Sequence, residues 1–106
     1  MIKVNLIKSE TEFKEISIEG HSGYDELGKD IVCSAVSTAF YLSLGLLEKV
    51  TKDFKYFCDE KNAKMKIQIT NPSEMSNLIL ENLEECLTSI SKQYAKNVKI
   101  SKIKEN

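Results

Sequence analysis

The chain has 106 residues, of which 42% are hydrophobic and 29% are charged, and its formal net charge is −1. This length fits one domain with a single core, residues 1–106, and the composition is that of a folded globular protein rather than a disordered one. All 15 basic residues are lysines. The lack of arginine, the preferred side chain for bidentate contacts to phosphate and bases, argues against a direct nucleic-acid role.

The three cysteines, Cys33, Cys58 and Cys86, are odd in number and widely spaced, with no CxxC pair. This spacing argues against a disulfide framework or a zinc site, and a single histidine leaves few other soft ligands, so we expect no metal and no cofactor. No apolar run approaches the roughly 20 residues that span a bilayer, and residues 1–6 lack the layout of a signal peptide. We therefore expect a cytoplasmic protein without a membrane partner.

The first residues predict two strands. Ile2, Val4 and Leu6 alternate with polar residues, which is typical of a half-buried strand. A second alternating segment covers residues 13–20. The polar residues 8–12 between them make a plausible hairpin connection.

A helix is predicted after a loop rich in glycine and charge at residues 21–30. From Ile31 to about Lys49 the apolar residues recur at helical spacing, and the polar residues form only a narrow stripe, so we expect most of this helix to be buried. Gly45 inside it costs about 1 kcal/mol relative to alanine. We interpret it as an adaptation to close packing.

A second helix is predicted to start at the segment Asn-Pro-Ser-Glu. Asn71 can cap the helix, Pro72 suits its first position, and Glu74 lies three residues after the cap. The apolar residues that follow recur at helical spacing and predict one buried face. They are Met75, Leu78, Ile79, Leu83, Cys86, Leu87, Ile90 and Tyr94.

The remaining strands complete the predicted fold. Residues 54–59 and 63–70 form a second hairpin pattern, and Val98, Ile100 and Ile103 suggest a last strand. The order is strand, strand, helix, strand, strand, helix, strand. The simplest way to bury these faces is an α+β fold with two helices packed on one face of a mostly antiparallel sheet.

Residues 20–37 contain the only histidine and three of the four glycines. A free thiol is only a few per cent thiolate at neutral pH. Cys33 falls in the first turn of the predicted helix, with Asp30 as the N-cap, and unpaired N–H groups and the helix dipole there favour an anion. The Asp30 carboxylate opposes this effect unless backbone N–H groups hold it. Ser37 lies one turn further on the same face, where its hydroxyl could donate to the sulfur or orient His21.

His21 falls at the predicted end of the second strand, twelve residues before Cys33. The flexible loop residues Gly20, Gly23 and Gly28 would let the loop fold back and close over a bound ligand. The composition fits a thiol nucleophile and its base, and hence acyl transfer, with backbone N–H groups at the helix start as oxyanion donors.

The same residues also have a purely structural interpretation. A cysteine among small residues on a buried helix is most often a packing residue, and a single histidine near a strand end is most often an ordinary surface or core side chain. Cys58, in a strand, and Cys86, on the predicted apolar face of the second helix, are interpreted as structural. The pattern of residue types leaves catalysis and packing both open for Cys33.

The exact sequence of this segment is more specific than its residue types. Gly-His-Ser at 20–22 and Gly-Lys-Asp-Ile-Val-Cys-Ser-Ala-Val-Ser at 28–37 resemble the signature of the ribosomal-processing cysteine protease family, called Prp or YsxB-like. This resemblance implies a homodimer that removes a short N-terminal extension from a large-subunit ribosomal protein, the twenty-seventh by its conventional number. It implies Cys33 as nucleophile and His21 as base, with supporting roles for Asp30 and Ser37.

Three functional hypotheses therefore remain from the sequence. The leading one is a cytoplasmic cysteine endopeptidase that acts on the end of a ribosomal protein. The second is a non-catalytic binding module in ribosome assembly, and the third is a thiol redox sensor with an exposed, low-pKa cysteine. The sequence favours the first, because a sensor needs no histidine at a fixed place and a binding module needs neither residue.

Overall fold

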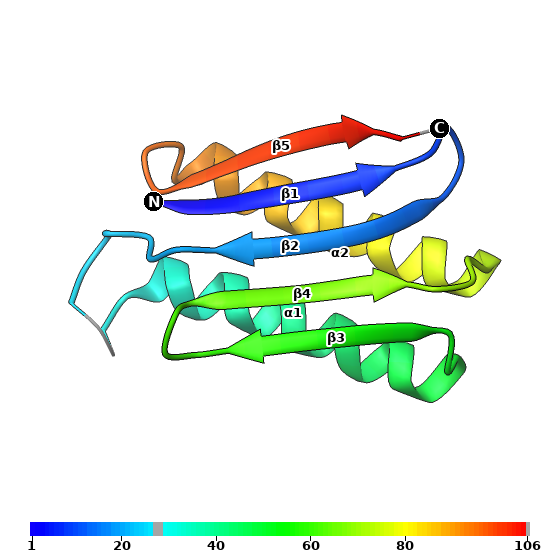
Figure 1. The fold of residues 1–106 in the computed structure, drawn as a ribbon. Helices are drawn as coiled ribbons and strands as arrows, with labels where there is room; N and C mark the ends of the chain where they lie inside the picture. Colours follow the sequence, from blue (N-terminus) through cyan, green and yellow to red (C-terminus); the bar gives the residue numbers. More distant parts are fainter. Residues whose placement is uncertain (27–28, 106) are drawn as a thin grey trace.

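A computed structural model describes residues 1–26 and 29–105 of the chain. Seven elements follow one another in the predicted order, from two strands through to a last strand (Figure 1). They are β1 (Ile2–Lys8), β2 (Phe13–Glu19), α1 (Ile31–Val50), β3 (Phe54–Asp59), β4 (Lys64–Ile69), α2 (Glu74–Gln93) and β5 (Val98–Lys104).

The five strands form one sheet in the order β3-β4-β2-β1-β5. All neighbouring pairs are antiparallel except β1 and β5, which run parallel. Both helices cover the same face of this sheet, α1 behind β4 and β3 and α2 behind the other half (Figure 1). The predicted α+β fold with a mostly antiparallel sheet is confirmed.

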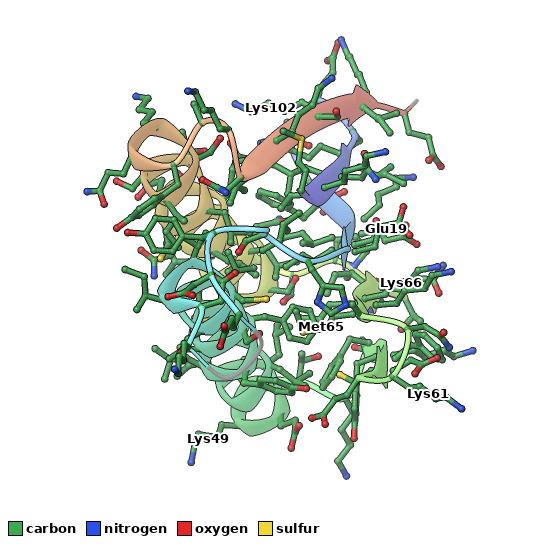
Figure 2. The ribbon with its side chains drawn as sticks, turned by 90° about the vertical axis from the view of Figure 1, so that its left-hand side faces the viewer. Glu19, Lys49, Lys61, Met65, Lys66 and Lys102 are labelled. Carbon is green, nitrogen blue, oxygen red and sulfur yellow. The ribbon has the colours of Figure 1, made fainter. Side chains whose placement is uncertain are left out.

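The core lies between the sheet and the helices. Strand alternation places one side chain in two on the helix-facing side, and Val4, Leu6 and Ile16 are fully buried there. Glu19 and Lys66 project from the opposite, open face of the sheet (Figure 2). The sheet is thus half-buried, as the alternating polar residues predict.

Helix α1 is less buried than expected. Val32, Val36, Phe40 and Leu47 pack into the core, whereas the outer side is open, with Leu42 67% exposed. The wide apolar stripe therefore exceeds what the sheet and α2 can cover. The expectation of close packing at Gly45 is also wrong, because a Cβ added there would meet no atom within 4 Å.

Helix α1 also corrects the expectation that no apolar segment approaches the length needed to span a bilayer. Ile31–Val50 has 20 residues and a mean hydropathy of 1.6 over its most apolar window, so by length and composition alone it could cross a bilayer. The core helices of globular proteins meet the same criterion, and α1 supplies six residues to the buried set. Its apolar character is accounted for in part by that packing.

Helix α2 starts two residues later than a cap at Asn71 would give. Its N-cap is Ser73, whose hydroxyl accepts from the N–H of Ser76 at 3.1 Å while the Ser76 hydroxyl accepts from the N–H of Ser73 at 3.0 Å. This reciprocal capping box satisfies two backbone donors at once. Pro72 accordingly precedes the cap instead of occupying the first turn of the helix.

The predicted buried face of α2 is only partly correct. Met75, Leu78 and Cys86 are exposed, so the structural interpretation of Cys86 as a member of the apolar face is wrong. Leu80 and Ser76 are buried instead. The helix packs against both α1 and the sheet. Its buried face is therefore rotated about the helix axis relative to the face that the apolar residues alone predicted.

Candidate active site

Cys33 lies in the first turn of α1, as predicted. Asp30 caps the helix with an extended backbone, and its Oδ1 atom accepts the N–H groups of Val32 at 3.0 Å and Cys33 at 2.9 Å. The Asp30 carboxylate is therefore held on backbone N–H groups, which is the condition under which its negative charge opposes a thiolate least. Cys33 is half-buried and its thiol is free.

The second oxygen of Asp30 holds the preceding loop. Oδ2 accepts a hydrogen bond from the buried Ser22 hydroxyl, and it accepts the N–H groups of Tyr24 at 3.2 Å and Asp25 at 3.3 Å. Burial raises the pKa of Asp30, but the hydrogen bonds from Ser22 and from the backbone of Cys33, Asp25 and Tyr24 together lower that pKa below its ordinary value. The group is thus an ionised anchor that joins the loop to the helix start.

The far side of the loop is attached to the end of α2. The Asn97 side chain donates to the carbonyl of Ser22 at 2.9 Å. The rings of Tyr24 and Tyr94 pack edge to face with centroids 5.3 Å apart. These contacts come from residues 70 or more positions apart, so the tertiary fold fixes Ser22 and Tyr24 in this loop.

His21 is positioned by the turn that ends β2. Gly20 has φ +99°, and a Cβ there would lie 2.5 Å from the carbonyl oxygen of Met1. Only glycine fits a backbone of positive φ packed this closely against another segment of the chain. The N–H of Gly20 donates to the Ala63 carbonyl at 2.9 Å, so the residue just before His21 is attached to the turn between β3 and β4.

The predicted role of the three loop glycines has to be considered for each glycine in turn. Gly20 is required by close approach and positive φ, and Gly23 also has a positive φ of 71°, although open space surrounds it. Both therefore serve a defined backbone conformation in this structure, and the predicted loop closure stays a prediction. Gly28 lies outside the described residues.

His21 and Cys33 line the same cavity, which has a volume of about 260 Å³. Ser37 lines it as well, one turn along α1 from Cys33. Figure 2 looks onto this end of the molecule, and Met65 of β4 lies there between the helices and the sheet. The fold thus brings the predicted histidine, cysteine and serine together around one opening.

The rest of the cavity wall is mixed in character. Tyr41 and the turn between β3 and β4 contribute polar groups, and core residues from the sheet and α1 contribute an apolar part. These further lining residues are Ile2, Ile18, Gly20, Val36, Tyr41, Asp59, Glu60, Ala63, Lys64 and Met65. An apolar wall beside a thiol and an imidazole suits a peptide side chain next to a reacting carbonyl.

The expected oxyanion donors are occupied. The N–H groups of Val32 and Cys33 donate to the Asp30 side chain, and that of Ser34 donates to the Asp30 carbonyl at 3.1 Å. In this arrangement these three groups cannot also receive a developing oxyanion. The expectation that helix-start N–H groups receive the oxyanion is therefore contradicted for Val32, Cys33 and Ser34 in this arrangement.

Tyr41 and Cys58 form a contact that the sequence did not indicate. The hydrogen bond between the Cys58 thiol and the tyrosine hydroxyl, together with burial, raises the pKa of Tyr41. Cys58 is half-buried and packs against the core, in keeping with its structural interpretation. Tyr41 lies eight residues after Cys33, at the same helical spacing as Ser37, and this periodicity was the available signal.

Metal binding finds no support among residues 1–26 and 29–105. Within these ranges no three His, Cys, Asp or Glu side chains come close enough together to hold an ion.

Comparison with known proteins gives a consistent result. The family model described as cysteine protease Prp matches residues 1–99. The ribosomal processing cysteine protease Prp of Staphylococcus aureus strain Mu50 is 26% identical over 105 residues, which cover 95% of this chain and 98% of that protein.

Solved structures share the fold. The S. aureus protease Prp with a covalently linked product peptide superposes with a TM-score of 0.89 at 24% identity, covering 96% of this chain and 99% of that one. SMU.848 of Streptococcus mutans gives a TM-score of 0.86 at 25% identity, covering 99% of this chain and 96% of that one. The sequence match to the family and the structural match to these proteins therefore both extend over nearly the whole chain.

Proposed function

The chain belongs to the cysteine protease Prp family and is itself a cysteine protease, and on that premise we propose that it removes the N-terminal extension of a large-subunit ribosomal protein, the twenty-seventh by its conventional number. The observation that carries the proposal is the shared cavity, where His21 and Cys33 lie in a chain matched by the family model over residues 1–99. The reaction would take place in the cytoplasm.

The chemistry is acyl transfer through Cys33. The thiolate sulfur attacks the carbonyl carbon of the scissile peptide bond, and the C–N bond breaks as His21 gives a proton to the leaving amine. A thioester to the N-terminal fragment remains. Water then attacks the thioester carbon with His21 as base, which releases the carboxylic acid and returns the thiol. No metal or other cofactor takes part.

The relatives support a peptide substrate. Solved structures of the S. aureus protease Prp carry a substrate peptide in one case and a covalently linked product peptide in another. A covalent link to a product is what nucleophilic catalysis by a thiol would leave. By resemblance, the same course of reaction is proposed for this chain.

Asp30 and Ser37 have supporting roles in this proposal. Asp30 acts as a positioning residue, because its two oxygens join the start of α1 to the loop after His21. Ser37 lines the cavity on the same helix as the nucleophile. Its hydroxyl can orient the imidazole or donate to the sulfur.

A homodimer is proposed as the working form. Large apolar side chains are exposed on the outer side of the two helices, which lie next to each other (Figure 1). They are Ile31, Leu42, Leu46, Val50, Met75 and Leu78. Leu42→Glu should shift the protein to monomers in analytical ultracentrifugation. Ile103→Glu, on exposed β5, is the matched control, and equal behaviour of both variants would contradict this surface.

Peptide cleavage tests the proposed function directly. A peptide spanning the N-terminal extension and the residues after it should be cut once by the wild-type protein, and Cys33→Ala and His21→Ala should abolish the cut. Cys58→Ala and Cys86→Ala are the matched controls and should keep it. Cleavage that survives Cys33→Ala would exclude the nucleophile. Binding of the peptide without any cleavage would favour the ribosome-assembly binding module.

A further inference from the structure

Strand β3 is an edge of the sheet, hydrogen-bonded to β4 on one side, and no described strand pairs with its other side. An edge strand offers a row of backbone N–H and C=O groups to any extended segment that comes beside it. Proteins usually protect such edges with lysine, proline or a covering element. Strand β3 carries a single lysine, Lys55, and its Tyr56 and Phe57 are 57% and 52% exposed.

The other edge is built differently. Strand β5 carries Lys99, Lys102 and Lys104, and it ends in an ion pair between Lys104 and Glu10 at 3.1 Å. Such a lysine-rich edge discourages pairing with another strand. The two edges of one sheet therefore differ in chemistry, and β3 is the one suited to a peptide.

The two aromatic side chains of β3 lie on opposite faces of the sheet. Tyr56 pairs with the buried Ile67 of β4 and so shares its helix-facing side, whereas Phe57 pairs with Lys66, which projects from the open face (Figure 2). A strand placed beside β3 would have an aromatic ring next to its side chains on either face. Apolar residues at both alternating positions of the incoming strand are therefore favoured.

Helix α1 lies beside the helix-facing side of β3 and adds to the surface along this edge. Tyr41 of α1 lies beside Cys58 of β3, and this tyrosine is 42% exposed. In Figure 1, α1 runs behind β3 and emerges beyond it. The open space beside Gly45, one turn after Tyr41, adds room along the same stretch of the helix.

The edge leads to the proposed active site. Strand β3 runs from Phe54 to Asp59, and Asp59 lines the cavity that holds His21 and Cys33. A segment lying along β3 in the same direction would thus arrive at the cysteine with its carboxyl end. That is the direction required of an extension that lies on the N-terminal side of the cut bond.

We propose that the segment preceding the scissile bond adds to β3 as a parallel strand, so that the sheet edge, together with Tyr41 and Tyr56, guides it to Cys33. This inference rests on the proposed function. Six residues of β3 at about 3.3 Å each give an edge about 20 Å long, enough to pair with a segment of similar length. Recognition then depends on the backbone of the peptide as much as on its side chains.

Backbone methylation tests the pairing. In a parallel pair the peptide groups that face the partner come from alternate residues. Two versions of the extension peptide, N-methylated at the odd or at the even positions before the cut, should therefore behave differently. One version should lose at least about tenfold in kcat/KM and the other should stay near the unmodified peptide. Equal kcat/KM values for the two versions would overturn the proposal.

A protein variant tests the location. Tyr56→Lys gives β3 the character of a protected edge, and Ile103→Lys makes the matched change on β5. Tyr56→Lys should raise KM about tenfold for the full extension peptide, with kcat unchanged. It should leave unaltered the cleavage of a short peptide that keeps only residues next to the cut. Ile103→Lys should change neither.

The outcomes separate the two proposals. If the wild-type protein cuts neither peptide, the proposed function fails. If it cuts both, and neither methylation pattern nor Tyr56→Lys changes KM, the protease assignment stands and the β3 edge is excluded as the binding site. Loss of cleavage of the short peptide by Tyr56→Lys would also count against the edge, because the side chain would then act at the cut itself.

Discussion

The Oδ1 atom of Asp30 accepts the backbone N–H of Cys33 at 2.9 Å, so the helix cap directly holds the residue proposed as nucleophile. The other oxygen of the same carboxylate accepts from Ser22, Tyr24 and Asp25 in the loop after His21. One side chain thus connects the two segments that carry the proposed catalytic residues. Its contribution to stability and its contribution to positioning can be measured separately.

Asp30→Ala should lower the free energy of unfolding by about 1–2 kcal/mol from the lost cap. It should also lower kcat/KM for the extension peptide, because the loop is no longer joined to α1. Ser73→Ala, which removes the cap of α2 far from the cavity, is the matched control. It should cost similar stability in urea unfolding and leave kcat/KM of the folded protein unchanged. Equal losses of kcat/KM in the two variants would contradict a positioning role.

The stabilisation by Asp30 should depend on pH in a defined direction. Burial raises the pKa of this carboxyl, but the hydrogen bonds from Ser22 and the backbone outweigh it and lower the pKa below 3.8. A group whose pKa is lowered by folding stabilises the folded state fully above its unfolded pKa, and the stabilisation is lost as pH falls through the folded pKa. We therefore expect the difference in unfolding free energy between wild type and Asp30→Asn to be constant above about pH 5 and to shrink below about pH 4. Urea titrations across this range measure it, and a difference that grows on acidification would contradict the assignment.

The fold was predictable because each element carries its own pattern. Alternation in β1 and β4 and the wide apolar stripe of α1 each follow from local periodicity, and together they leave few arrangements. The failures come from tertiary packing. Whether Leu42 or Leu78 is covered depends on how far each helix reaches over the sheet, and the choice of Ser73 over Asn71 depends on the partner hydroxyl of Ser76.

The candidate site was likewise predictable only in part. Cys33, Asp30 and Ser37 share one helix start, so their proximity was visible in the spacing. Asp59 and the turn around Ala63 reach the cavity because β4 pairs with β2, a contact between residues about 50 positions apart. No local pattern encodes that pairing. The whole wall formed by the β3–β4 hairpin was therefore missing from the prediction.

Two glycine substitutions should have opposite effects. Gly20→Ala places a Cβ against the Met1 carbonyl on a backbone with positive φ, and it should destabilise the protein by roughly 1–3 kcal/mol and displace His21. Gly45→Ala meets open space within a helix and should stabilise it by about 1 kcal/mol. Thermal unfolding of both variants tests this. A tolerated alanine at position 20 would mean that the turn before His21 is not fixed by its contact with β1.

The three cysteines should differ in reactivity in an order that exposure does not predict. Cys86 is exposed, whereas Cys33 and Cys58 are half-buried, so accessibility alone would make Cys86 react fastest. If the helix start and the His21 imidazole activate the Cys33 sulfur, iodoacetamide should modify Cys33 first near pH 7. The rate at Cys33 should then fall in His21→Ala while the rate at Cys86 stays constant.

Mass spectrometry of peptides after timed alkylation gives all three rates in one sample, with Cys86 as the internal standard. Fast modification of Cys33 combined with cleavage of the extension peptide supports the protease assignment. Fast modification without cleavage would favour the redox sensor, because that function needs the thiolate and not the acyl-transfer geometry. If Cys86 reacts first and His21→Ala leaves the Cys33 rate unchanged, the imidazole does not activate this sulfur and the Cys/His mechanism is wrong.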